Sequence, residues 1–572
     1  MTNNAIKGRN DLLAWEASKP DNFFTSDKNL QYVLQRYMGE KAYHIAEGNF
    51  TRFGAQTATI IDESAKVEDR VGNHPRLERW SGLGERIEQI EFHPNHDITG
   101  KLIWQSGLMA IQGDAGRNVE QMGLYYLLSH NGEAGHMCSL ACTSGLIRAL
   151  QYAADDDLKA KFLPPLLDPD YETMQHGAQF LTEVQGGSDV GANAVEAVPA
   201  DDGTWRISGE KWFCSNINAD QFLMTARATD ADGTRGLGLF LVPRLLDDGS
   251  TNGFHIRRLK DKLGTRTLAS AELDFRDAVA YPIGEVEKGF KTVVELVLNT
   301  SRLMNAVACA GTMRRVYIEA GQYACNRKAF GQTIATFPMV QETVADIMVE
   351  YYAATASSFY LAHLLDKIET GNASEQDKAT YRMLVNINKY ITSINGSHVI
   401  HQGIEVLGGN GAIESFSILP RLYRDMIVLE SWEGTHNVLC VQVMRDIARY
   451  GIHEAFIQSM QEQLASVTDS RLLESAKIVG DAIQRIVSIL GKMQQNGEAY
   501  VQTHARRFVD LASYVAQGTL LLSEAQWEID NELATIKPDV IAYFVNKHLN
   551  QSYDPLDDEQ YGERLERLMT AF

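Results

Sequence analysis

Hydrophobic residues in the first part of the chain recur at helical spacing. The segments over residues 30–48 and 138–154 place apolar side chains three and four positions apart. Loops that contain proline and glycine separate such segments. The pattern predicts a mainly helical N-terminal domain over residues 1–174.

The spacing changes to that of strands and turns after this region. Short apolar runs over residues 205–215, 221–229, 236–243 and 269–275 alternate with turn sequences such as "DDG" and "ADG". No strand-helix-strand spacing and no G-x-G-x-x-G after a strand accompany them, so a Rossmann nucleotide site has no support. The pattern predicts a β domain over residues 175–285.

Long helical periods return and continue to the end of the chain. We expect a helical bundle over residues 286–450 and a helical extension over residues 451–572. In the extension, a single stripe at alternating spacings of four and three predicts one face of a packed helix. Its members are Leu472, Ala476, Val479, Ile483, Ile486, Leu490 and Met493. The predicted fold class is mainly α with a central β domain.

Composition and charge argue against several classes of function and location. The 572 residues are 44% hydrophobic, and 53 Lys and Arg against 74 Asp and Glu give a formal net charge of −21. Such a balance argues against general binding to nucleic acid or anionic membranes, which requires a basic surface. No stretch approaches the 18 apolar residues of a membrane span. The N-terminus lacks the apolar core of a signal peptide.

The six cysteines show no spacing typical of zinc ligands, and no metal site is expected. Cys138 and Cys142 would share a helix face, and we interpret them as small buried hydrophobic residues. Few cysteines in a long chain fit a reducing compartment, so a cytoplasmic location is expected.

Two segments of the β region contain candidate ligand-binding residues. "FLTEVQGGSDVG", residues 180–191, combines glycines with the hydroxyls of Thr182 and Ser188, but alone it fits a plain turn. "GEKWFCSNINAD", residues 209–220, sets an aromatic pair beside Ser215 and could stack on a planar ring. An ordinary buried strand explains it equally well.

Two segments of the bundle region are also ambiguous alone. In residues 326–341, Arg327 precedes Phe330 and could hold a phosphate, although cations are favoured at any helix C-terminus. In residues 404–425, "GGNG" breaks one helical run before another, as an interhelical turn would.

The segment "ESWEGTHNVLC", residues 430–440, sets an acidic residue between a large aromatic and a glycine. A carboxylate desolvated beside Trp432 would have a raised pKa, which suits a general base. A surface acid or a helix N-cap is the alternative for Glu433.

Taken together, the order and spacing of these segments resemble the acyl-CoA dehydrogenase family. The resemblance rests on T-E-x-x-x-G-S-D from Thr182, G-x-K-x-[aromatic]-x-[ST]-N from Gly209, and R-K-x-F-G-x-x-I from Arg327. "DKLGTRTLASAELDF" from Asp261, "LGGNG" from Leu407 and [aromatic]-E-G-T from Trp432 extend it. The match covers roughly residues 100–450.

The resemblance implies the architecture and the reaction. It implies an N-terminal helical domain, a β-barrel-like domain and a four-helix bundle, with FAD bound between them and a homotetrameric assembly. The extra C-terminal helical domain lies outside that core. Glu433 would be the catalytic base, which removes the α-proton of an acyl-CoA thioester while a hydride passes to flavin N5. The backbone N–H of Glu433 and the flavin ribityl chain would hydrogen bond the thioester oxygen.

The resemblance also assigns binding residues. Arg302, Ser188 and Gly434 would lie near the substrate. Arg327, Phe330, Glu405, Gly408 and Gly409 match segments that reach the FAD of a neighbouring subunit. The residues that would contact the flavin of the same subunit are Leu181, Thr182, Gly187, Ser188, Phe213, Ser215, Thr435 and Asn437.

Several features resemble one branch of the family, the alkylation-response or AidB-type members. Pro338 and Glu405 stand where the family usually has glutamine, the β region starts late, and about 120 residues follow the core. Members of that branch have been linked to DNA through a basic C-terminal domain. Here residues 451–572 contain 10 Lys and Arg against 18 Asp and Glu, the wrong sign for phosphate contacts, so DNA binding is not expected.

Three functions remain open from the sequence. The first is an FAD-dependent dehydrogenase of a medium-to-long or unusual acyl-CoA that passes electrons to an electron-transfer flavoprotein. The second is an acyl-CoA oxidase, which shares the first half-reaction. The third is a stress-response flavoprotein that binds acyl-CoA or DNA with little turnover; a retained Glu433 and the acidic surface argue against it.

Overall fold

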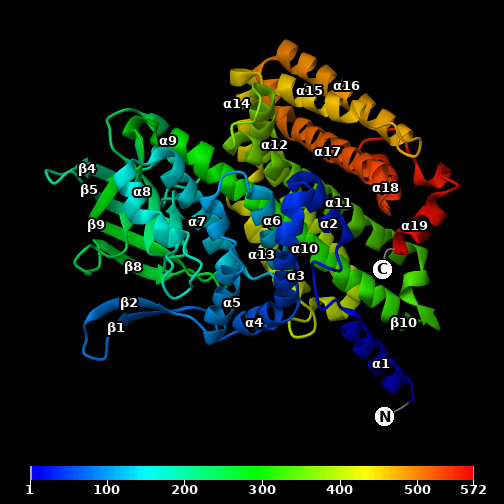
Figure 1. The fold of residues 1–572 in the computed structure, drawn as a ribbon, viewed down its shortest axis with the longest axis horizontal. Coiled ribbons are helices and arrows are strands. Elements are labelled where there is room, and N and C mark those ends of the chain that lie inside the picture. Colours follow the sequence, from blue (N-terminus) through cyan, green and yellow to red (C-terminus); the bar gives the residue numbers. More distant parts are fainter. Residues whose placement is uncertain (1–2, 571–572) are drawn as a thin grey trace.

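The computed structural model describes residues 3–570 and has a β domain at one end, a helical bundle in the middle and a further helical layer beyond it (Figure 1). The chain begins with helices that pack beside the bundle. They are α1 (Asn3–Ser18), α2 (Lys28–Met38), α3 (Glu40–Ala58), α4 (Ile60–Glu68), α5 (Pro94–Gln105), α6 (Asn118–Ser129), α7 (Ala134–Ala153) and α8 (Asp156–Phe162).

A β-hairpin interrupts this helical region and was not predicted. Strands β1 (Arg76–Trp80) and β2 (Arg86–Glu91) pair antiparallel, with Leu77 opposite Ile90. Ile90 is buried in the core of the β domain, with Leu77 packed against that core. The hairpin is short and mostly exposed, so its period of two is weak in the sequence.

The β domain closes on itself. Its strands are β3 (Gly177–Phe180), β4 (Glu196–Pro199), β5 (Trp205–Ser215), β6 (Gln221–Arg227), β7 (Leu237–Pro243), β8 (Phe254–Leu259) and β9 (Ser270–Pro282). The order β3-β6-β4-β5-β9-β7 returns from β7 to β6 by a seven-residue antiparallel register, and β8 pairs with β9. The predicted β-barrel-like domain is therefore confirmed.

The strands differ in pattern because they differ in burial. All of β7 and most of β6 are buried, so both are nearly continuous apolar runs. The longer β5 alternates in part, with Ile207 and Cys214 facing the core and Phe213 on the other face. The partly exposed face of β5 is available to form one wall of a site.

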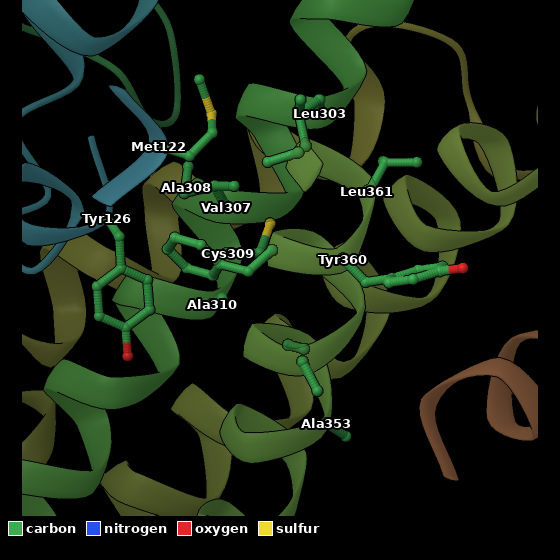
Figure 2. Close-up of a cluster of buried hydrophobic side chains, with 14 of the residues drawn as sticks. Met122, Tyr126, Leu303, Val307, Ala308, Cys309, Ala310, Ala353, Tyr360 and Leu361 are labelled. Carbon is green, nitrogen blue, oxygen red and sulfur yellow. The ribbon is translucent and has the colours of Figure 1, made fainter. Parts of the chain in front are cut away.

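The bundle follows the β domain. Its helices are α9 (Gly289–Thr292), α10 (Asn299–Asn326), α11 (Pro338–Glu369), α12 (Glu375–Leu407), α13 (Leu419–Ser431) and α14 (His436–Tyr450); the small strands β10 (Lys328–Ala329) and β11 (Gln332–Thr333) join α10 to α11. Helices α6, α10 and α11 bury a common cluster (Figure 2). Small residues such as Ala308 and Ala353 alternate there with large ones such as Tyr126 and Tyr360, which lets the helices approach closely.

The C-terminal layer packs on the bundle. It consists of α15 (Ile452–Ala465), α16 (Leu473–Asn496), α17 (Glu498–Asp530), α18 (Lys537–His548) and α19 (Tyr561–Met569). Five residues of the predicted stripe, including Val479 and Ile483, are buried, and Ala476 and Leu490 are partly buried against the same core. The hydroxyl of Tyr390 on α12 donates to Asp510 on α17 at 2.6 Å and joins the two layers. Within residues 3–570, no helix has the length and apolar character needed to cross a membrane.

Candidate active site

Glu433 lies in the short loop between α13 and α14, in a backbone conformation that side chains rarely adopt. Its φ is +57° and that of the next residue, Gly434, is +104°. A left-handed glutamate is uncommon and persists only where the surroundings hold it. The glycine after the carboxylate therefore allows the loop to reverse direction, and Thr435 begins α14 as its N-cap residue.

Two cations hold the backbone of this loop. Arg302 on α10 donates from Nε to the carbonyl oxygen of Glu433 at 3.0 Å. Lys389 on α12 donates from Nζ to the carbonyls of Glu430 and Gly434, at 2.9 and 3.0 Å. The sequence predicts Arg302 near the substrate but gives no indication of Lys389, because a single lysine in a long helical pattern does not show which way its side chain points.

The carboxylate of Glu433 itself is left without a partner. Its Oε2 is inaccessible to solvent and accepts no hydrogen bond from any residue of the described range 3–570. Burial raises the pKa of Glu433, and the charges of Arg302 and Lys389 oppose that rise. A desolvated carboxylate that no hydrogen bond stabilises is a stronger proton acceptor than a solvated one, as a general base requires.

An apolar pocket of about 610 Å³, its mouth included, opens at Glu433. One wall is a face of α10, where Ser301, Asn305, Ala308 and Thr312 follow each other at spacings of four, three and four. The helix rises about 16 Å over the eleven steps from Ser301 to Thr312. The other walls come from α7 and α13 and include Met137, Cys138, Cys142, Met426, Leu429 and Trp432. Cys138 and Cys142 are small buried residues on one helix face, as predicted.

The loop 181–188 is anchored by an ion pair whose two residues belong to the family-like motifs but are not among the predicted site residues. Glu183 pairs with Lys211 at 2.8 Å, and both side chains are almost fully buried. Glu183 also accepts from the backbone N–H of Ala194. Lys211 donates to the carbonyl of Leu181. These contacts explain the glutamate of T-E-x-x-x-G-S-D and the lysine of G-x-K. Glu183 holds the loop from within, and Lys211 holds it from strand β5.

The predicted flavin residues of the β domain lie on this loop and on β5. The backbone N–H of Trp212 donates to the carbonyl of Thr182 at 2.9 Å, which joins the two segments. A Cβ at Gly187 would come within 2.6 Å of the Thr182 hydroxyl, so a larger residue there would displace the Thr182 side chain. Ser188 is exposed, the Phe213 side chain is 38% exposed, and the Ser215 hydroxyl lies 3.1 Å from that of Ser270.

A second group of predicted residues lies at the far end of the bundle. Arg327 and the left-handed Phe330, 96% exposed, follow the end of α10. Glu405, Gly408 and Gly409 lie at the end of α12 and are exposed. Asn410 donates to the Tyr323 hydroxyl at 3.2 Å, which links the two segments.

This second group is distant from the Glu433 loop along the same helix. Lys389, which touches the loop, and Glu405 are sixteen residues apart on α12, or about 24 Å. Within one chain, the predicted residues at the end of α12 therefore do not share a site with those of the Glu433 loop.

The C-terminal layer also reaches the Glu433 loop, which the sequence did not indicate. Arg506 on α17 donates from Nη2 to Oδ1 of Asn437 at 2.9 Å. Asn437 is one of the residues predicted to hold the flavin. The contact places the extension at the edge of the predicted cofactor site.

The whole chain resembles characterised proteins in sequence. Residues 178–278 match the middle-domain model of acyl-CoA dehydrogenases and residues 287–448 the C-terminal-domain model. Acyl-CoA dehydrogenase family member 11 of Caenorhabditis elegans is 30% identical over 547 residues, which are 91% of this chain and 86% of that protein. The chain belongs to the acyl-CoA dehydrogenase family. It is thus an FAD-dependent enzyme of that family, and the acyl-CoA dehydrogenase fold of the structure agrees.

Further matches identify the branch of this acyl-CoA dehydrogenase. Residues 15–173 match the N-terminal domain of the adaptive response protein AidB, and residues 452–550 match the C-terminal domain of acyl-CoA dehydrogenase 11. The putative acyl-CoA dehydrogenase AidB of Escherichia coli K12 is 30% identical over 68% of this chain and 72% of that protein. The solved structure of Caenorhabditis elegans ACDH-11 in complex with C11-CoA has a TM-score of 0.86 at 27% identity, over 97% of this chain and 95% of that one.

Proposed function

We propose that this acyl-CoA dehydrogenase oxidises a medium-to-long or otherwise unusual acyl-CoA, with Glu433 as the catalytic base. The observation that carries the proposal is the unpaired, solvent-inaccessible Oε2 of Glu433 at an apolar pocket of about 610 Å³. Binding sites for small molecules are usually concave and mainly apolar, with few polar groups, as this pocket is. The α10 wall of about 16 Å supports a chain longer than a short-chain acyl group.

In the proposed reaction, Glu433 takes the α-proton of the thioester as the Cα–Cβ bond becomes double. FAD, when bound, supplies the acceptor of the hydride that leaves the β-carbon, at its N5. The backbone N–H of Glu433 is proposed to hydrogen bond the thioester oxygen, where negative charge develops. Arg302 and Lys389 hold the loop so that the carboxylate and this N–H act from fixed positions.

Loop 181–188 and strand β5 have features that suit a flavin. Gly187 leaves space that a side chain would fill, and the Phe213 ring is open on the exposed side of β5. We assign Leu181, Thr182, Gly187, Ser188, Phe213, Ser215, Thr435 and Asn437 to the flavin of the same subunit. Ser188, Arg302 and Gly434 are assigned to the substrate side.

The residues at the far end of α12 are assigned to a neighbouring subunit's cofactor. Arg327, Phe330, Glu405, Gly408 and Gly409 are exposed or partly exposed and lie about 24 Å along α12 from the loop contact. An aromatic side chain that is 96% exposed, in a strained conformation, is expected where another subunit covers it. These observations support a homotetramer with shared cofactor sites.

We further propose that the reduced enzyme passes its electrons to an electron-transfer flavoprotein, in the cytoplasm. All six cysteines are free thiols, which supports a reducing compartment. The net charge of −21 and the acidic C-terminal layer argue against a DNA-binding role.

The test is anaerobic mixing of the FAD-loaded protein with straight and branched acyl-CoAs of increasing length. Bleaching of the flavin by one class establishes the half-reaction and its substrate. The Glu433→Gln variant should still bind FAD, but the rate at which acyl-CoA reduces the flavin should fall by about 10²- to 10⁴-fold. Equal rates in the variant would remove the base assignment, and no bleaching by any thioester would favour a binding function. Peroxide formation in air separates an oxidase from a dehydrogenase.

A further inference from the structure

A cluster of buried histidine and carboxylate side chains lies behind the pocket wall, outside the site described above. His96 comes from α5, Glu133 is the N-cap residue of α7, and His136 is in the first turn of α7. One ligand-type atom of each lies within 4.8 Å of the others, and all three residues are buried. Glu68, from the end of α4, contacts the same cluster.

The hydrogen bonds of the two imidazole rings indicate which nitrogen of each ring keeps a lone pair that is free to bind a ligand. Nε2 of His136 lies 2.9 Å from the carbonyl oxygen of His96, which can only accept, so Nε2 must carry the proton. His136 Nδ1 is then a free lone pair, and it is buried without a partner. Nδ1 of His96 lies 2.8 Å from Glu68, so a proton on Nδ1 leaves the Nε2 lone pair of His96 available.

The carboxylates add unpaired acceptors to the same place. Glu133 uses Oε2 to accept the backbone N–H of His136, while its Oε1 is buried without a partner. Glu68 likewise has a buried, unpaired Oε2. Across residues 3–570, no lysine or arginine pairs with or hydrogen bonds either carboxylate. Buried acceptors of this kind are stabilised either by protons on the carboxyls or by a bound cation.

We propose that His96, His136 and Glu133 bind one divalent transition-metal ion, with Zn²⁺ as the preferred ion. Two imidazole nitrogens and one carboxylate oxygen form a ligand set typical of zinc, whereas calcium and magnesium prefer oxygen ligands alone. Glu68 is not a ligand in this assignment but a positioning residue. A carboxylate on the outer nitrogen of a metal-bound histidine orients the ring and raises its basicity.

Binding requires a small local rearrangement. The two rings are stacked, with centroids 3.9 Å apart and an angle of 18° between planes. Zinc bonds of about 2.1 Å bring tetrahedral ligand atoms to roughly 3.4 Å from each other, so the atoms must approach from their present spread and the rings must tilt. Gly135 leaves room for this movement, because a Cβ there would lie 2.8 Å from Glu133 Oε1.

The ion would fix one wall of the acyl pocket. It would join α4 and α5 to the N-terminus of α7, and the next turns of α7 carry Met137, Cys138 and Cys142, which line the pocket. Gly132 and Ala134, on either side of Glu133, line it as well. The site is thus structural and lies outside the flavin chemistry.

The experiment measures metal in untagged, FAD-loaded protein by elemental analysis and follows Co²⁺ binding to chelator-treated protein by its visible absorption. We expect one ion per chain. His136→Gln keeps a donor for the His96 carbonyl but removes the Nδ1 ligand, and Glu133→Gln keeps a cap acceptor but removes the charge. Each should lower the metal content at least about 10-fold, and Glu68→Gln should weaken Co²⁺ binding by about 10- to 100-fold.

His176→Gln is the matched control. His176 is buried beside the cluster and bonds to Ser139, but it is not among the proposed ligands, so this variant should keep the metal. Wild-type protein without metal and without Co²⁺ absorption would overturn the proposal. Equal loss of metal in His176→Gln would also overturn it, because the effect would then follow from disturbed packing. Flavin content and acyl-CoA bleaching are separate readouts, so failure of the metal site does not affect the proposed function.

Discussion

Lys389 donates to the carbonyl oxygens of Glu430 and Gly434, on both sides of Glu433, and not to the Glu433 carboxylate. Arg302 likewise binds the backbone carbonyl of Glu433. The two cations therefore position the loop while the carboxylate remains an unpaired base. Their charges also limit how far burial raises the pKa of Glu433.

Removal of the Lys389 charge should change the pH dependence of flavin reduction. In Lys389→Met the pKa of Glu433 rises further, because one of the two cations that lower it is lost. A base must be deprotonated to act, so the rate should require a higher pH than in the wild type. Displacement of the loop should also lower the maximal rate by about 10²-fold. The measurement is the anaerobic reduction rate across a pH series.

Lys389→Arg serves as the control for this prediction. It retains a cation, so its pH profile should stay close to that of the wild type even if the rate falls. A Lys389→Met profile that does not move would mean that the lysine contributes no field at Glu433.

Two substitutions along α10 should limit acyl chain length to different extents. Ser301, Asn305, Ala308 and Thr312 line the pocket. Arg302, next to Ser301, binds the backbone of Glu433, so the later residues of α10 lie progressively farther along the helix from that contact. Thr312→Phe should slow reduction by the longest acyl-CoAs only, whereas Ala308→Phe should also affect medium chains. For acyl chains that reach the new ring, we expect the second-order rate constant of flavin reduction to fall by about 10-fold or more. The reason is that forcing extra volume into a packed site costs about 1–3 kcal/mol.

The measurement is the bleaching rate against chain length for both variants, with flavin content and melting temperature as controls. Short-chain substrates should react as in the wild type in both. If the two variants lose the same substrates, the acyl chain does not follow α10.

Much of the fold could be predicted, whereas the candidate site also contains contacts that no local pattern encodes. The short segments around Thr182, Arg327 and Glu433 indicate the family by their order. Each is a local motif of glycines and charged residues that can be read directly from the sequence. Lys389 could not be identified, since it is one polar residue in a helix that is buried on several faces. The closure of β7 onto β6 is similarly a tertiary event. The His96, Glu133 and His136 cluster unites distant segments, although the i, i+3 pair Glu133 and His136 was a visible signal.

Breaking the ion pair between Glu183 and Lys211 should destabilise the fold and the flavin loop together. Either Glu183→Gln or Lys211→Met leaves one buried partner without its counterpart, which costs about 3–5 kcal/mol. The double variant should lose less than the sum of the single ones. Chemical denaturation and retained FAD are the measurements, and near-additive losses would contradict the pairing.

The same pair predicts a pH dependence of stability. Burial opposes ionisation of Glu183, but Lys211 and the hydrogen bond from Ala194 hold the pKa of Glu183 below its ordinary value. Because the folded pKa is the lower one, the stabilisation is present above the unfolded pKa of about 4.5 and is lost as the pH falls through the folded value. The difference in stability between wild type and Glu183→Gln should therefore narrow on acidification below about pH 4.5.

Loss of Arg506 should weaken the cofactor site from the C-terminal layer. Arg506→Ala removes the hydrogen bond to Asn437, which the proposed function assigns to the flavin. A hydrogen bond of this kind contributes about 0.5–1.5 kcal/mol, so FAD should dissociate about 3- to 10-fold more readily. Titration of the apoprotein with FAD, followed by flavin fluorescence, measures this. Arg507→Ala is the matched control, because among the described residues Arg507 hydrogen bonds the Thr503 carbonyl of its own helix and not Asn437, while its charge acts on Asp510 as that of Arg506 does. An effect of equal size in both variants would point to net charge and not to the Asn437 contact.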